Sequence, residues 1–313
     1  MPRPVRWLLL ALGGIAVILG LSARQPYAHT VARELEVGGL KRNYLVHVPV
    51  ALPKDKAVPV VLVFHGGSGD GAGTERITRF SALADREGFL VVYPNGIGKN
   101  WNDGRIFAGS EPHRRNIDDV AFIARVIDAV AWEHPIDPKR IYATGISNGG
   151  IFSHYLAAHL SSRIAAIAPV VGGIADPFYQ RFRPEKPVSV FIIQGRNDPL
   201  VPYQAGGISE GKRGKVISTD EAIRKWVLHD GCSPEPVTGR LPDKDPKDGC
   251  TVTWSTWSKG RDGTEVMLYN IAGGGHTWPG GPQYLPERLI GKVCRDFDAT
   301  EVIWDFFKRH PKP

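Results

Sequence analysis

The sequence predicts an α/β fold in which helices cover both faces of a mostly parallel sheet. Along most of the chain, short runs of branched apolar residues alternate with segments of helical spacing. Near the start, two alternating runs at residues 31–37 and 43–48 enclose Gly38 and Gly39, which predicts an antiparallel hairpin at one edge. With 313 residues, 42% of them apolar, the chain is long enough to bury one large core.

The buried strands are recognised by continuous apolar runs, and the helices by apolar residues that recur every three or four positions. Strands are expected at residues 58–64, 89–93, 141–144, 164–171, 188–194 and 264–271. Helices are expected at residues 79–88, 118–133, 151–160, 221–229 and 300–309. Residues 206–214 and 233–248 are read as the longest polar loops.

Residues 1–23 differ in composition from the rest of the chain. Arg3 and Arg6 precede an uncharged run at residues 7–21, and the small residues Ser22 and Ala23 follow it. This pattern is typical of an export signal, and the run is shorter than the roughly 20 residues that span a bilayer. We therefore expect a secreted or periplasmic protein whose residues 24–313 form a single catalytic domain, or a membrane-anchored one if the segment stays uncleaved.

The charge pattern gives no sign of a nucleic-acid partner. The net charge is +7, but lysine and arginine are scattered and do not alternate with stacking aromatic residues. A basic soluble surface is the simpler interpretation. The only membrane contact expected is through the N-terminal segment, and the sequence leaves the oligomeric state open.

An exported chain meets oxidising conditions, so its three cysteines are candidates for a disulfide rather than for metal binding. Cys232 and Cys250 flank a segment rich in Pro, Asp and Lys that has little to bury, and we expect them to pair. Cys294 is then left as a single thiol. No HExxH motif and no paired-cysteine spacing supports a zinc site.

The pentapeptide Gly145-Ile146-Ser147-Asn148-Gly149 spells GxSxG between a predicted strand and a predicted helix. In that setting it describes a sharp turn that raises a serine hydroxyl above the sheet, where only glycines fit on either side. Ser147 is therefore the candidate nucleophile. A flexible loop before the helix is the alternative interpretation.

A serine hydroxyl needs a general base and a carboxylate that orients this base. Asp198 and His276 each follow a predicted strand, and they occur in the order serine, acid, histidine. Asp176, which follows the neighbouring strand, is the rival acid. His65 ends a buried strand and is read as structural, holding the turn after it.

Attack of a serine on an ester carbonyl creates an oxyanion, which two backbone amides usually stabilise. We expect one from Asn148, directly after the nucleophile, and the other from Gly67 in the run after the first buried strand. An ordinary strand-to-loop turn is the alternative interpretation of this run. A phosphate-binding loop is disfavoured, because residues 67–73 lack the lysine that such a loop requires.

Five motifs resemble the polyhydroxybutyrate depolymerase and feruloyl esterase family of α/β-hydrolases. They are His65-Gly66-Gly67-Ser68, Tyr93-Pro94-Asn95-Gly96, Asp118-Asp119-Val120, Gly145-Ile146-Ser147-Asn148-Gly149-Gly150 and Gly274-Gly275-His276-Thr277-Trp278-Pro279-Gly280. The resemblance implies an α/β-hydrolase fold, hydrolysis of carboxylic esters without a cofactor, and Ser147, Asp198 and His276 as the triad.

The same resemblance implies aromatic residues near the site, so Trp278 and Trp101 are expected to face the acyl or aryl group of the substrate, with a packing role as the alternative for both. Ser68, in the first of the five motifs, is also expected to contact the substrate. Polymer depolymerases of the family often have a cysteine where this chain has Gly67 and an alanine where it has Asn148. We therefore expect a small or oligomeric ester, of the hydroxybutyrate, feruloyl or acetyl type. A serine peptidase of the same fold and a non-catalytic binding protein are the alternatives.

Overall fold

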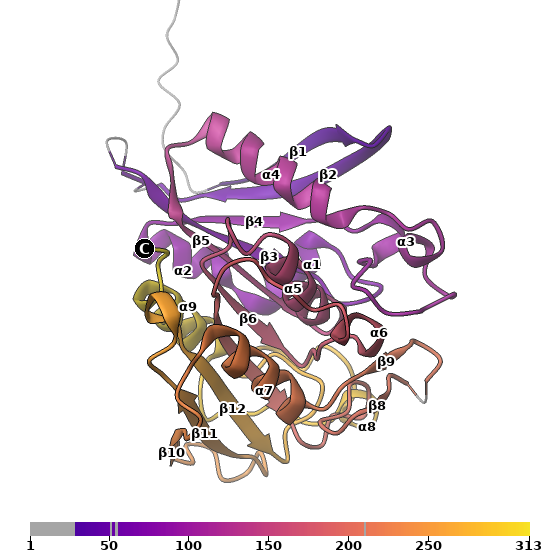
Figure 1. Cartoon of the computed structure of the whole chain (residues 1–313), viewed down its shortest axis with the longest axis vertical. Coiled ribbons are helices and arrows are strands. Elements are labelled where there is room, and N and C mark those ends of the chain that lie inside the picture. Colours follow the sequence, from indigo (N-terminus) through magenta and orange to yellow (C-terminus); the bar gives the residue numbers. More distant parts are fainter. Residues whose placement is uncertain (1–28, 51, 54–55, 210) are drawn as a thin grey trace, which may run out of the picture.

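The computed structural model describes residues 29–50, 52–53, 56–209 and 211–313. A ten-stranded sheet runs through the molecule (Figure 1), in the order β1-β2-β4-β3-β5-β6-β7-β12-β11-β10. Its strands are β1 (His29–Val37), β2 (Leu40–Val48), β3 (Val58–Phe64), β4 (Leu90–Pro94), β5 (Ile136–Ile146), β6 (Ala166–Val170), β7 (Ser189–Gly195), β10 (Val237–Arg240), β11 (Thr251–Trp257) and β12 (Val266–Ala272). A small second sheet pairs β8 (Gly206–Gly207) with β9 (Lys215–Val216).

The helices connect these strands. They are α1 (Gly71–Thr78), α2 (Phe80–Glu87), α3 (Glu111–Arg114), α4 (Asp119–Glu133), α5 (Asn148–His159), α6 (Asp176–Tyr179), α7 (Thr219–Asp230), α8 (Glu287–Ile290) and α9 (Ala299–Arg309), with single 3-10 turns η1 (Ile97–Lys99) and η2 (Arg261–Gly263). Within the described residues, no helix is long and apolar enough to cross a membrane. The predicted export signal at residues 1–23 lies outside them.

The predicted parallel sheet with an antiparallel hairpin at its N-terminal edge is confirmed. β4, β3, β5, β6, β7 and β12 run parallel, and the β1–β2 hairpin joins β4 in antiparallel register. The other edge differs from the prediction because β11 and β10 add a second antiparallel pair. The loop read at residues 233–248 therefore contains an edge strand, and the run Thr251–Trp257 was missed.

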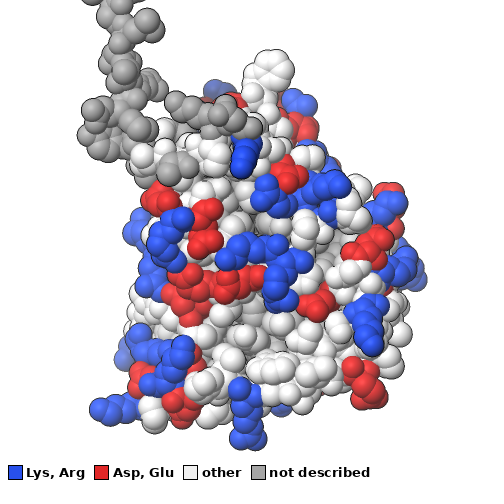
Figure 2. Space-filling view, turned by 90° about the vertical axis from the view of Figure 1, so that its left-hand side faces the viewer, with Lys and Arg blue, Asp and Glu red and all other residues white. Residues whose placement is uncertain are grey.

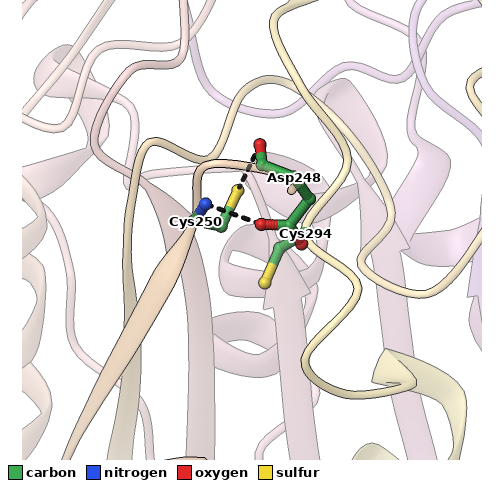
Figure 3. A group of neighbouring side chains, drawn as sticks. All are labelled: Asp248, Cys250 and Cys294. Carbon is green, nitrogen blue, oxygen red and sulfur yellow. Dashed lines mark hydrogen bonds between the residues drawn. The ribbon is translucent and has the colours of Figure 1, made fainter. Parts of the chain in front are cut away.

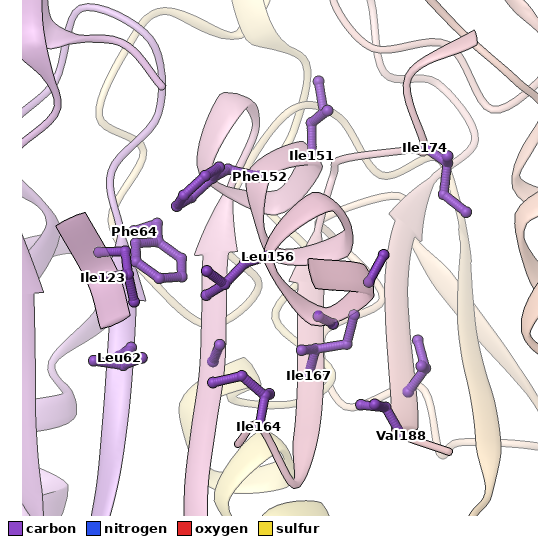
Figure 4. Close-up of a cluster of buried hydrophobic side chains, with 14 of the residues drawn as sticks. Leu62, Phe64, Ile123, Ile151, Phe152, Leu156, Ile164, Ile167, Ile174 and Val188 are labelled. Carbon is purple, nitrogen blue, oxygen red and sulfur yellow. The ribbon is translucent and has the colours of Figure 1, made fainter. Parts of the chain in front are cut away.

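Two hydrophobic cores form because the central strands present alternate residues to opposite faces of the sheet. In β3, Leu62 and Phe64 face a core covered by α4, α5 and α7, while Val61 and Val63 face one covered by α2 and α9. Figure 4 shows the first core, where Phe152 and Leu156 of α5 extend toward Phe64. Helices therefore cover both faces of the sheet, and a site has to lie at the ends of the strands.

The outer surface is charged but not polarised on the face shown in Figure 2. There, lysine and arginine lie among aspartate and glutamate rather than in a continuous basic area. Ion pairs at the surface, such as Arg33–Glu133 and Arg86–Glu301, neutralise part of the positive charge locally.

The turn at the end of β5 is packed against β3 so closely that it tolerates only glycine. A Cβ added at Gly145 would lie 2.7 Å from the Phe64 carbonyl oxygen, and one at Gly149 would lie 2.7 Å from that of His65. These separations are well inside van der Waals contact. The backbone of α5 can therefore enter next to β3 only because these side chains are absent.

We predict that Gly149→Ala lowers the free energy of unfolding by about 2–3 kcal/mol, because the added methyl group forces α5 away from β3. Chemical denaturation monitored by tryptophan fluorescence measures the change. Gly206→Ala is the matched control, since its Cβ would meet nothing closer than 3.4 Å. Equal stability of the two variants would contradict the packing argument.

Candidate active site

Ser147 is the single residue between the end of β5 and the start of α5, and its backbone is strained. Its φ of 59° and ψ of −121° lie in a region that non-glycine residues rarely adopt. The turn is held from both sides, because the Ser147 N–H donates to the Val170 carbonyl at 3.0 Å and its own carbonyl accepts from Ile151 at 2.9 Å. This geometry is the one expected for the GxSxG segment.

The structure brings His276 and Asp198 together at the ends of neighbouring strands β12 and β7. His276 Nδ1 lies 2.7 Å from Asp198 Oδ2, and both side chains are buried. Asp198 is fixed in turn, because its Oδ1 accepts the backbone N–H groups of Leu200 at 2.7 Å and Val201 at 2.9 Å. The rival acid, Asp176, is exposed at the first turn of α6.

One cavity of about 600 Å³ contains both Ser147 and His276. The glycine-rich run after β3 forms one wall and includes Gly67 and Ser68. Further lining comes from residues that sequence reasoning missed: Arg76, Ile77, Leu200, Ser209, Arg213, Tyr284, Leu285 and Ile290. They come from separate loops and carry no common motif, so only the fold assembles them.

The amides expected to form the oxyanion hole lie next to each other. A Cβ placed on Gly67 would be 3.9 Å from the Cβ of Asn148. In the hydrogen bonding of the described part of the chain, neither the Gly67 nor the Asn148 N–H donates to an acceptor. Asn148 is the first residue of α5, where helix geometry leaves the N–H without an internal partner. Neither N–H is therefore used by a hydrogen bond within the described part of the chain.

His65 joins the two loops behind this wall. The Gly96 N–H donates to its Nε2 at 2.9 Å, so the proton must reside on Nδ1, which lies 2.8 Å from the Gly66 carbonyl oxygen. The side chain is fully buried, and burial lowers the pKa of His65 to about 4. A neutral imidazole therefore holds the turn, as the sequence interpretation expected.

A buried polar network supports Asn148 from below, and sequence reasoning missed it. The Asn148 side chain accepts from the Trp101 N–H at 2.8 Å and donates to Asp103 Oδ2 at 2.6 Å. Asp103 also contacts Arg105 at 2.7 Å and His113 at 3.0 Å. Burial raises the pKa of the Asp103 carboxyl, but the Arg105 guanidinium and His113 more than reverse this and lower it to about 2.

The two tryptophans expected to contact substrate are not at the cavity, and this expectation is wrong. Both are fully buried. Trp101 stacks on Phe152 with ring centroids 5.0 Å apart and donates to the His65 carbonyl, whereas Trp278 donates to Thr300 on α9. Large aromatic rings close to a site can serve only to pack its supporting loops, and the sequence does not separate the two roles.

The predicted Cys232–Cys250 disulfide is also wrong. Cys232 lies near the end of β11, where the adjacent Ser233 N–H donates to the Ser258 carbonyl, while Cys250 directly precedes the first residue of that strand. A seven-residue strand spans roughly 20 Å, and a disulfide needs Cα atoms within about 7 Å. The missed strand β11 is the physical reason for the error.

Comparison with known proteins identifies the family of the chain. The family model described as Esterase PHB depolymerase matches residues 43–180. A putative esterase, NocK, from Nocardia uniformis subsp. tsuyamanensis is 30% identical over 299 residues, covering 90% of this chain and 84% of that protein. The chain belongs to this esterase family. Family membership confirms the predicted class, a carboxylic ester hydrolase.

Other relatives are larger proteins. Feruloyl esterase B of Piromyces equi is 30% identical over 75% of this chain, and poly(3-hydroxyalkanoate) depolymerase C of Paucimonas lemoignei is 31% identical over 50% of it. The chain spans 42% and 37% of their lengths. The solved acetyl xylan esterase from Aspergillus awamori superposes with a TM-score of 0.54 at 14% identity, over 79% of this chain and 94% of that one, which supports the α/β-hydrolase fold.

We predict that His65 makes the protein acid-sensitive. Its pKa is about 4 when folded, against 6.5 for the free side chain, so the unfolded chain binds the proton more tightly. Stability should therefore fall as the pH drops from about 6.5 to about 4, by up to about 3 kcal/mol. Denaturation midpoints of the wild type and His65→Gln across this range measure the effect.

His65→Gln should show the weaker pH dependence, because a neutral amide can accept from Gly96 and donate to Gly66 at every pH. His159→Gln, which removes an exposed imidazole from α5, is the control and should behave as the wild type does. Parallel pH profiles for wild type and His65→Gln would refute the assignment.

Proposed function

We propose that this esterase uses Ser147 as its nucleophile, His276 as general base and acid, and Asp198 as the group that orients His276. The observation that carries the proposal is the 2.7 Å contact between His276 Nδ1 and Asp198 Oδ2, with Ser147 in the same cavity. With Nδ1 bonded to a carboxylate, Nε2 is left to accept the serine proton.

The reaction then proceeds through an acyl-enzyme. Ser147 Oγ attacks the ester carbonyl while His276 takes its proton, and the oxygen that gains negative charge lies between the N–H groups of Gly67 and Asn148. His276 returns the proton to the departing alcohol. A water molecule, deprotonated by His276, then releases the acid and restores the serine.

We further propose that the substrate is a small or oligomeric ester. A cavity of about 600 Å³ lies within the range of sites for single small molecules, and apolar Leu200, Leu285 and Ile290 give an acyl or aryl group a place to bind. Feruloyl, acetyl and 3-hydroxybutyrate esters are the types to compare, since relatives are named feruloyl esterase, acetylxylan esterase and poly(3-hydroxyalkanoate) depolymerase, and the family model is described as PHB depolymerase.

Export through residues 1–23 belongs to the same proposal, with residues 24–313 as the single mature domain. The support is the sequence pattern of two arginines followed by an uncharged run. Recovery of uncleaved chain only from the cytoplasm of its native host would contradict export.

Ser147→Ala is expected to lower kcat for p-nitrophenyl acetate or butyrate by at least about 10³-fold, because it removes the hydroxyl that forms the acyl-enzyme in the proposed mechanism. Stopped-flow and steady-state assays measure the loss, and a fluorophosphonate probe should label the wild type but not the variant. Ser162→Ala, which changes an exposed serine that does not line the cavity, is the control and should keep the wild-type kcat. Labelled protein that cleaves peptides but no ester would favour the peptidase alternative, and unlabelled wild type would favour a binding protein.

Asp198→Asn should reduce kcat by about 10²–10⁴-fold, since the imidazole loses the carboxylate that fixes its tautomer and stabilises its charged form. Asp176→Asn is the matched comparison, because this exposed carboxylate should leave kcat within about twofold. Measuring both variants with one p-nitrophenyl ester decides between the acids. The reverse pattern would show that Asp176 is the acid.

A further inference from the structure

Two buried cysteines lie side by side below the loop that carries His276. Cys250 and Cys294 are 2% and 1% exposed, and their sulfur atoms, together with a carboxylate oxygen of Asp248, all lie within 4.8 Å of one another (Figure 3). The two cysteines are 44 positions apart in the sequence and come from different segments. Their meeting is therefore a product of the fold.

Both cysteines belong to segments that adjoin the His276 loop. Cys250 precedes Thr251, whose partner in the sheet is Ala272, the last residue before this loop. Cys294 ends the segment 290–294, which runs beside the loop. Its backbone is already bonded there, since the Gly280 N–H donates to the Cys294 carbonyl at 2.9 Å and the Gly275 N–H donates to that of Lys292 at 3.0 Å.

The surroundings favour a bond between the sulfurs over a metal ion. Both Asp248 carboxylate oxygens accept backbone N–H groups, from Cys250 and from Arg295, each at 2.6 Å. A metal would also need thiolates. The hydrogen bond to Cys250 and burial instead raise the pKa of Cys294, which keeps its thiol protonated. A disulfide removes both thiols without leaving a buried charge.

We propose that Cys250 and Cys294 form a disulfide that fastens the segment 290–294 to the start of β11 beneath the His276 loop. The oxidant is an external disulfide, such as oxidised glutathione or a protein disulfide. One cysteine loses its proton and attacks this disulfide, which forms a mixed disulfide and releases the first external thiol. The second cysteine then loses its proton, attacks the mixed disulfide and displaces the second external thiol. Two protein S–H bonds and one external S–S bond break, one protein S–S bond forms, and the external partner leaves as two thiols.

Equilibration of the purified full chain in a glutathione redox buffer tests the proposal. After acid quenching, denaturation and alkylation, mass spectrometry should find one modified cysteine, Cys232, and a linked peptide that contains Cys250 and Cys294. Prior reduction should raise the count to three. Three modified cysteines without reduction, or a linked peptide that contains Cys232, would overturn the proposal.

Thermal unfolding provides the second measurement. Because the bond closes a loop of about 45 residues, reduction should lower the Tm by roughly 5–10 °C. Cys232→Ser should show the same shift, whereas the Cys250→Ser, Cys294→Ser double variant should start at the lower Tm and not respond to reduction. If reduction leaves the Tm of the wild-type protein unchanged, the proposed stabilising role of the disulfide is refuted.

Metal analysis separates the remaining alternative. The protein is incubated with Zn²⁺, dialysed and assayed for bound zinc. Less than 0.1 equivalent is expected. One equivalent of zinc that disappears in the double variant would show that these side chains form a metal site instead. These measurements involve neither Ser147 nor an ester, so their failure would leave the proposed catalytic function intact.

Discussion

The close approach of the Ser147 turn to the carboxyl end of β3 is the constraint on which the site depends. Glycines at positions 145 and 149 allow the α5 backbone to pass next to the carbonyl oxygens of Phe64 and His65. Only this spacing places the first amide of α5 beside the glycine-rich run after β3. The strained φ of Ser147 is part of this close approach, and in the proposed mechanism it brings the hydroxyl near the two amides of the oxyanion hole.

The remaining groups reach the same place through the register of the parallel strands. Ile271 of β12 pairs with Gly195 of β7, so the loops that follow these strands begin side by side. Asp198 and His276 are the third and fifth residues beyond those paired positions, and their contact closes the gap between the loops. Because carboxyl ends of parallel strands share one edge, residues far apart in sequence meet without any long excursion of the chain.

The central fold and the positions of the proposed triad residues were predictable because their signals are local. Continuous apolar runs identified β3 and β7, and the strand-turn-helix context of Ser147 identified the turn. The predictions were wrong where contacts between distant parts of the chain determine the structure. The run Thr251–Trp257 is rich in β-branched and aromatic residues, as a strand should be, yet it lies between polar segments, and missing it led to the wrong cysteine pair. Trp101 and Trp278 carried no signal that separates packing from binding.

Asn148 differs in residue type from its counterpart in the polymer depolymerases, but only its position in the structure shows what the side chain does. Its difference from the alanine of polymer depolymerases predicted a smaller substrate, but its side chain is buried and bonds to Trp101 and Asp103 instead of lining the cavity. A carboxylate bonded to this residue would by itself oppose negative charge on an oxygen bound to the neighbouring amide. Arg105 contacts that carboxylate at 2.7 Å and balances it. The loop thus holds Asn148 firmly while adding little net negative charge beside the proposed oxyanion hole.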